Sequence, residues 1–179
     1  IIMLPQQYKW LENETGPKML IEALKCYGVT EIPGAKSNDI IMLWAKELGI
    51  EKQYTNDDTA WCGMFMALIA KRAGKVLPFT YIQSLWARNW AKFGTKTASP
   101  ELGDVLVFVR NGGGHVALYV GEDSDCYHCL GGNQGNKVSI TRIKKSRLFQ
   151  ACSTPYNVKP TNVRKVLLGS SGEISTNEG

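Results

Sequence analysis

The chain has 179 residues, of which 44% are hydrophobic and 21% are charged. These values are typical of one globular domain with a hydrophobic core, and they exclude a disordered or fibrous protein. Charged residues or glycines interrupt every apolar run, so the sequence contains no segment suited to span a bilayer. The net charge of +5 at pH 7 is compatible with polyanionic partners, such as bacterial wall polymers, and equally with a role in solubility alone.

Four helices are predicted in the first half of the sequence. Apolar residues recur at helical spacing in each of them, and a glycine follows or ends each one, as is common at helix ends. The third helix is apolar almost all round, so it should be the central, buried one. The expected ranges are residues 15–28, 37–49, 59–73 and 84–93.

Five strands are predicted after Pro100. The first, residues 104–109, is nearly all apolar, which is typical of a strand buried on both faces. Three glycines lead into the second strand, and short polar segments separate the others. Helices followed by a meander of antiparallel strands indicate an α+β fold. The other strands are expected at residues 115–120, 126–133, 137–143 and 147–152.

The composition becomes polar after Pro155. We therefore predict one domain over residues 1–155 and a flexible C-terminal tail over residues 156–179. The densest basic segment, residues 142–147, has the character of an exposed turn and lacks interleaved aromatic side chains. Nucleic acid is therefore not expected as a partner.

Cys62 is the residue whose position indicates chemistry most directly. It falls in the first turn of the third predicted helix, where unpaired N–H groups and the positive end of the helix dipole favour a thiolate. A thiolate is a nucleophile at neutral pH, so this position indicates covalent catalysis. The five cysteines are odd in number and irregularly spaced, which argues against a disulfide scaffold and for a reducing compartment.

His115 is the candidate base for Cys62. It opens the second strand directly after three glycines, where the backbone can approach another element closely. Depending on the length of the turn before the next strand, either Asn133 or Gly132 falls opposite His115. An amide oxygen there can orient the imidazole. We predict Asn133 in this role rather than Gln134, because neighbours in a strand point to opposite faces.

Four short motifs, taken together, resemble a known family. The motifs are Trp61-Cys62-Gly63, Pro100-Glu101-Leu102-Gly103-Asp104-Val105, Gly114-His115-Val116-Ala117 and Gly131-Gly132-Asn133-Gln134. In this order they are similar to the bacterial and phage cell-wall cysteine peptidases of the NlpC and CHAP type, over about residues 8–155. The resemblance implies a papain-like fold, in which the cysteine helix packs on an antiparallel sheet that carries the histidine.

The resemblance also implies a peptidoglycan hydrolase, such as a phage endolysin, with neither cofactor nor metal. It would cleave an amide bond as an endopeptidase or an N-acetylmuramoyl-L-alanine amidase, with Cys62, His115 and Asn133 as the catalytic residues. Beside the backbone N–H of Cys62, the candidates for oxyanion or substrate contacts are Tyr54, Asp58, Trp61 and Gln134.

The first residues of the chain lack the features of a signal peptide. We therefore expect synthesis in the cytoplasm and action at the cell wall or periplasm after release or delivery, without insertion into a membrane.

Three other interpretations remain open. Cys126-Tyr127-His128-Cys129 could be a metal or redox motif, but alternation along a strand would separate Cys129 from the other two ligands, so core packing is preferred. The fold could instead serve as a non-catalytic wall-binding module with a sugar-stacking surface of tryptophans, although their helical spacing is more typical of a core. The same three residues could also transfer an acyl group to an amine.

Overall fold

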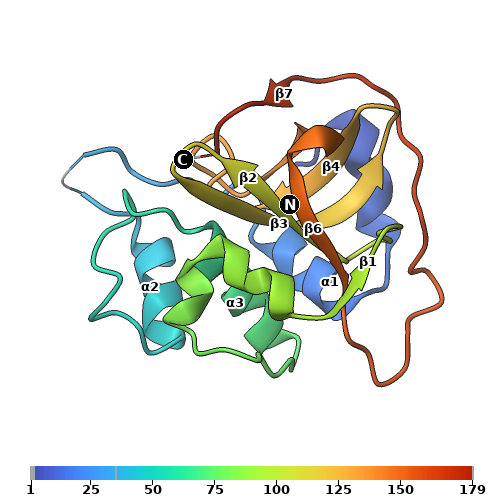
Figure 1. Ribbon diagram of the computed structural model, residues 1–179. Coiled ribbons are helices and arrows are strands. Elements are labelled where there is room, and N and C mark those ends of the chain that lie inside the picture. The colour runs from blue at the N-terminus through green and yellow to red at the C-terminus, as the bar shows by residue number, and fades with distance from the viewer. Residues whose placement is uncertain (1–2, 35, 179) are drawn as a thin grey trace.

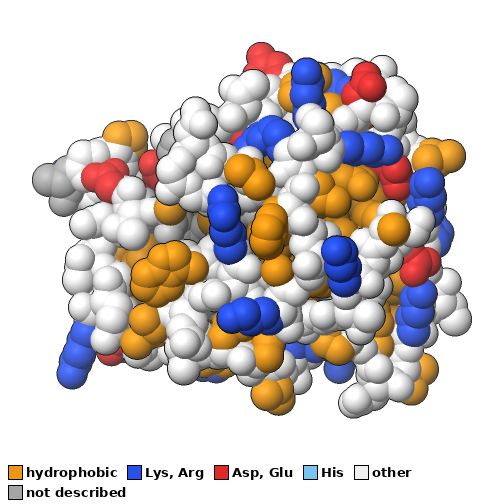
Figure 2. All heavy atoms as spheres, in the orientation of Figure 1, with side chains coloured by type: hydrophobic (Ala, Val, Ile, Leu, Met, Phe, Trp, Pro, Cys, Tyr) orange, Lys and Arg blue, Asp and Glu red, His pale blue; other side chains and the backbone are white. Residues whose placement is uncertain are grey.

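The computed structural model describes residues 3–34 and 36–178. The α-helices lie together against one face of a strongly curved, seven-stranded sheet (Figure 1). Helices dominate the first half of the chain and strands the second, so the predicted α+β class is confirmed. Figure 2 shows that Lys and Arg side chains are spread over the visible face, between hydrophobic patches.

Three of the predicted helices form as α-helices. The fourth predicted helix is instead two short 3₁₀ segments, η2 and η3. In an α-helix the carbonyls of Gln83 and Ser84 would accept backbone N–H groups four residues on, but here they accept the side chains of Asn89 and Trp90, at 2.8 and 3.0 Å. This competition from side chains explains why the segment does not continue as an α-helix. The elements are η1 (Gln6–Asn13), α1 (Lys18–Lys25), α2 (Asp39–Glu47), α3 (Cys62–Arg72), η2 (Gln83–Leu85) and η3 (Ala87–Lys92).

All five predicted strands are present, and two short strands that the sequence did not predict extend the sheet. The strand order is β1-β6-β2-β3-β4-β5-β7. Neighbouring strands are antiparallel except β5 and β7, which are parallel. The strands are β1 (Thr95–Thr97), β2 (Val105–Arg110), β3 (Gly113–Glu122), β4 (Cys126–Gly131), β5 (Ser139–Lys144), β6 (Leu148–Ser153) and β7 (Ile174–Ser175).

Near the loop, the register between β3 and β4 differs from both expected registers. Glu122 pairs with Tyr127, whereas the expected loops would have paired it with Cys126 or Asp125. A bulge between Tyr119 and Gly121 then restores the register expected for a three-residue loop, in which Leu118 pairs with Leu130. The strand β4 ends at Gly131, before it reaches the level of His115.

The helix α3 is the centre of the core, as its apolar sequence predicts. Nine of its residues are buried, from Cys62 to Ala70. Alternate side chains of β2 point to opposite faces of the sheet. Val105 and Val107 belong to the main core cluster, which contains the helices. The side chains of Leu106 and Phe108 belong to a second cluster on the other face.

Within the segment that we predicted as a separate, flexible tail, residues 166–168 and 174–178 pack against the sheet. Backbone hydrogen bonds join Glu122 to Val166 and Leu168, at 2.9 and 2.8 Å, and β7 extends the sheet beside β5. The carboxylate of Glu178 is buried and forms an ion pair with the guanidinium of Arg147. Polar composition alone does not reveal such long-range pairing, which explains the difference.

Two further findings concern membrane-spanning helices and the thiols. No helix within residues 3–34 and 36–178 has the length and apolar character that a membrane span needs. The five cysteines are all free and buried.

The first turn of α3 lies very close to η2. A methyl group added at Gly63 would collide with the backbone carbonyl of Ser84. The glycine therefore lets the segment 83–92 lie directly over the beginning of the cysteine helix, with no side chain between the two backbones.

We expect Gly63→Ala to lower the free energy of unfolding by about 1–3 kcal/mol, because the backbone of η2 must move away. This loss should exceed the gain that alanine brings as a better helix former than glycine. Urea unfolding would measure the change. Gly113→Ala is the matched control, since an added methyl group there meets nothing within 4 Å; equal destabilisation by the two substitutions would contradict the prediction.

Candidate active site

Cys62 is the first residue of α3. Trp61 is the N-cap residue, and its side chain does not cap the helix. The N–H groups of the first turn are therefore not engaged by the side chain of the N-cap residue. They provide partial positive charge next to the sulfur, which favours its thiolate form.

His115 is a residue of β3 and lies beside Cys62. Both side chains are shielded from solvent, with relative exposures of 3% for Cys62 and 0% for His115. The ring of Phe108, on the adjacent strand β2, stacks on the imidazole at a centroid distance of 6.5 Å. The Nδ1 atom of His115 is buried and forms no hydrogen bond within the described residues, and Cys62 is the neighbour that most raises the pKa of the imidazole.

The two groups change each other's protonation. Burial alone would raise the pKa of the Cys62 thiol, but the neighbouring His115 ring and the backbone N–H of Val116 lower it below its ordinary value. Burial alone would lower the pKa of His115, but the sulfur of Cys62 and, more weakly, Glu178 and Gln134 raise it. Opposite shifts of this kind favour a thiolate–imidazolium pair.

Gln134 orients the imidazole from the other side. Its Oε1 lies 2.9 Å from Nε2 of His115. Its Nε2 donates to the backbone carbonyls of Cys129 and Ser139, at 3.0 and 2.7 Å. Because two carbonyls accept hydrogen bonds from the amide nitrogen, the amide oxygen must face the histidine and accept from its Nε2–H. Nδ1 then remains free to exchange a proton with the sulfur.

The structure places Asn133 away from His115, which corrects the sequence prediction. Asn133 has a φ of 59°, in the left-handed region, and its Nδ2 donates to the backbone carbonyl of Glu178 at 3.2 Å. The strand pattern that favoured Asn133 does not apply, because β4 has already ended at Gly131. The sequence signal that could have led to Gln134 is the Gly131-Gly132 pair, which allows a sharp turn at this point.

The glycines before Gln134 permit its approach. A methyl group at Gly131 would come within 2.9 Å of the Gln134 Oε1 atom, and a methyl group at Gly132 would lie 2.7 Å from the ring of Trp61. Glycine at both positions therefore allows the amide and the indole to occupy their places beside Cys62 and His115.

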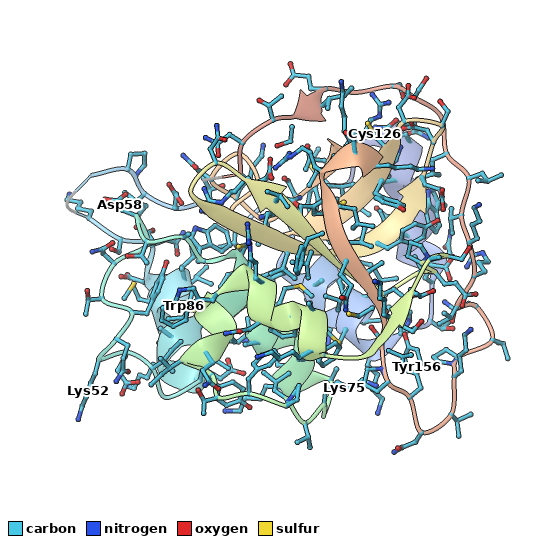
Figure 3. The ribbon with its side chains drawn as sticks, viewed as in Figure 1. Lys52, Asp58, Lys75, Trp86, Cys126 and Tyr156 are labelled. Atoms are coloured by element: carbon cyan, nitrogen blue, oxygen red, sulfur yellow. The ribbon has the colours of Figure 1, made fainter. Side chains whose placement is uncertain are left out.

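Of the three other predicted site residues, two have structural roles and the third is exposed. The indole of Trp61 is fully buried and donates to a carboxylate oxygen of Glu31 at 2.9 Å. The Tyr54 hydroxyl donates to the Thr59 carbonyl at 2.9 Å, and burial, with nearby acidic groups, raises its pKa. Asp58 is exposed on the loop before α3 (Figure 3). Neither the indole nor the phenol has a free N–H or O–H for an oxyanion, so the backbone N–H of Cys62 remains the donor that the geometry offers.

The loop before Cys62 depends on a residue that the sequence analysis did not single out. The carboxylate of Asp57 is buried, and its Oδ2 accepts from the backbone N–H groups of Ile32 and Asn38, at 3.0 and 2.7 Å. These bonds join the loop that precedes Cys62 to the loop before α2. Nothing in the local sequence distinguishes Asp57 from its exposed neighbour Asp58.

The residues of the Cys126–Cys129 segment are buried. His128 contacts the hydroxyl of Tyr8 through Nδ1 at 2.6 Å and the carboxylate of Asp123 through Nε2 at 2.8 Å. Arg142 also donates to Asp123, at 2.9 Å. Within residues 3–34 and 36–178 no group of three or more His, Cys, Asp or Glu side chains is placed to hold a metal ion.

Comparisons of the chain with protein-family models, with curated proteins and with solved structures gave no match. The function must therefore be inferred from the arrangement of Cys62, His115 and Gln134 itself.

The pH dependence of Cys62 alkylation would test the ion pair. We expect iodoacetamide to modify Cys62 at pH values below the ordinary thiol pKa of about 8.5, because His115 lowers the pKa of the thiol. In His115→Ala the profile should move to higher pH, since burial remains while the positive charge is lost. Mass spectrometry of the peptide that contains Cys62 separates its reaction from that of the other cysteines; identical profiles in the two proteins would exclude the pair.

Proposed function

We propose that this protein is a cysteine hydrolase that cleaves an amide bond. The observation that carries the proposal is the anchored amide of Gln134 bonded to the imidazole of His115, together with the buried sulfur of Cys62 at a helix N-terminus, whose pKa that imidazole lowers. The chain thus has a nucleophile, a base and a residue that orients the base, which are the parts that thiol catalysis requires.

The first chemical step is attack of the Cys62 thiolate on the carbonyl carbon of the amide. A carbon–sulfur bond forms, and negative charge develops on the carbonyl oxygen, which the backbone N–H of Cys62 can stabilise. The tetrahedral intermediate then collapses as the imidazolium of His115 gives its proton to the leaving nitrogen. The amine departs and a thioester with Cys62 remains.

Water completes the reaction. The neutral imidazole of His115 takes a proton from a water molecule, which attacks the thioester carbonyl. Collapse of the second intermediate breaks the carbon–sulfur bond, releases the carboxylic acid and restores the thiolate–imidazolium pair. Through both steps Gln134 accepts a hydrogen bond from Nε2–H and keeps the ring in the orientation that serves the sulfur.

We infer peptidoglycan as the substrate and a papain-like relation for the fold from the resemblance of the four motifs to the cell-wall peptidases. The arrangement of a cysteine helix against an antiparallel sheet that carries the histidine supports this relation. The net charge of +5 also suits a substrate within an anionic cell wall. The proposed site of action is the bacterial wall, reached by release or delivery from the cytoplasm.

Cys62→Ala and His115→Ala should each reduce lysis of purified cell walls by about 10³-fold or more, because covalent catalysis is lost. Turbidity of a wall suspension measures lysis, and thermal unfolding checks that both variants fold. Cys152→Ala is the control, since that thiol is buried beside η3 and bonds the carbonyl of Ala91 at 3.3 Å. Full lysis by Cys62→Ala would refute the thiol mechanism.

The correction from Asn133 to Gln134 leads to a second test. Gln134→Ala should lower kcat by about tenfold or more, because His115 loses the acceptor that orients it. It should also move the upper limb of the pH profile to lower pH, since Gln134 helps to raise the pKa of His115.

Asn133→Ala is the matched neighbour and should change kcat by no more than about threefold, with an unshifted profile. The pH dependence of wall hydrolysis by both variants is the measurement. A larger loss in Asn133→Ala than in Gln134→Ala would restore the original assignment.

A further inference from the structure

Trp86 is the tryptophan that the fold leaves in solvent. Its relative exposure is 64%, whereas Trp44, Trp61 and Trp90 are exposed by 3% or less. Figure 3 shows Trp86 at the front of the helical layer, and Figure 2 shows a large hydrophobic patch at the same place. An exposed indole offers a flat apolar face on which a sugar ring can stack.

The position of Trp86 relates it directly to the catalytic pair. On one side, Ser84 is in close contact with Gly63, the residue after Cys62. On the other side, a methyl group at Gly114, the residue before His115, would lie 3.1 Å from Cγ of Arg88 and 3.5 Å from Cβ of Ala87. The segment 84–88 therefore connects the two catalytic elements, and Trp86 lies in the middle of it.

The backbone beneath Trp86 is held firmly. The carbonyl of Trp86 accepts from the backbone N–H of Asn89 at 3.0 Å, and the side chain of Asn89 donates to the Gln83 carbonyl at 2.8 Å. The indole of Trp90 donates to the carbonyl of Ser84 at 3.0 Å. An aromatic side chain on an ordered segment loses little conformational entropy when it binds a ligand.

Two arginines lie against Gly114, the residue before His115, and provide positive charge there. Arg88 is exposed, and its guanidinium lies over the ring of Phe149, itself 50% exposed, at 5.5 Å from the centroid. Arg110 donates through Nε to the carbonyl of Gly114 at 3.1 Å. Neither guanidinium forms an ion pair with an acidic group of residues 3–34 and 36–178. Both therefore have N–H groups available for a carboxylate.

We propose that Trp86 and Arg88 form a substrate subsite for an acidic glycopeptide, in which the indole stacks on a sugar ring and the guanidinium binds a carboxylate. The inference rests on the proposed function, because it places this subsite beside the bond that Cys62 attacks. The exposed ring of Phe149 packs against the guanidinium of Arg88 and adds apolar surface to that of Trp86. Arg110 adds a second positive charge close to the sulfur, where it lowers the pKa of Cys62.

Binding without turnover provides the test. The ligand is a disaccharide–tetrapeptide fragment of peptidoglycan, titrated by calorimetry into the Cys62→Ala protein, which binds but does not react. We expect Trp86→Ala and Arg88→Ala, each added to Cys62→Ala, to weaken binding by about tenfold or more. Chitotetraose, which has sugars but no carboxylate, should lose affinity in Trp86→Ala and be little affected by Arg88→Ala.

The controls separate this subsite from other effects. Val76→Ala removes an exposed apolar side chain beyond the far end of α3 and should leave both affinities unchanged. Arg88→Lys should retain part of the fragment affinity, because it keeps the charge but loses the planar fork. Thermal unfolding of each variant confirms the fold.

The outcomes distinguish the subsite from the reaction. Unchanged fragment affinity in both Trp86→Ala and Arg88→Ala would overturn the subsite, even if Cys62→Ala abolishes lysis as proposed. If instead the two substitutions weaken binding while the Cys62→Ala protein lyses walls as well as the unaltered chain, the subsite stands and the proposed hydrolysis fails.

Discussion

The orientation of one amide group determines what the rest of the site can do. Two backbone carbonyls hold the nitrogen of Gln134, so its oxygen must face Nε2 of His115. That contact fixes which ring nitrogen carries the hydrogen and leaves Nδ1 toward the sulfur of Cys62. The carbonyls belong to Cys129 in β4 and Ser139 in β5, so strand pairing positions the amide. The reactivity of a helix residue thus depends on the pairing of two strands that are distant from it in sequence.

The sequence brought Cys62 and His115 forward as a candidate pair because their signals are local. An apolar helix predicts where Cys62 lies, and a glycine-rich turn predicts where the strand of His115 begins. Gln134 was not predicted as the orienting residue, because its position depends on backbone features that the alternation of side chains along a strand does not reveal. The end of β4 at Gly131 and the left-handed backbone of Asn133 together bring the next residue to the histidine. Each departs from the regular strand geometry that the prediction assumed.

The same distinction applies to the fold as a whole. Strongly periodic segments gave the α+β class and the order of the main helices and strands. The segment 83–92 had helical periodicity, yet its own side chains occupy the carbonyls that an α-helix needs. Residues 156–178 have a polar composition, yet backbone pairing with Glu122 and the buried Arg147–Glu178 ion pair hold them against the sheet. Contacts between residues far apart in sequence decided both outcomes, and a single sequence does not display them.

The thiols of this chain differ sharply in chemical character. Burial raises the pKa of Cys26, Cys126 and Cys129, whereas His115 lowers that of Cys62. Peroxides react with thiolates, so the lowered pKa of Cys62 favours oxidation of that sulfur to a sulfenic acid. Because that sulfur is the proposed nucleophile, such oxidation would stop the proposed hydrolysis without disturbing the core. The molecule would then persist as a folded but inert protein, which a thiol reductant could restore while the sulfur remained at the sulfenic stage.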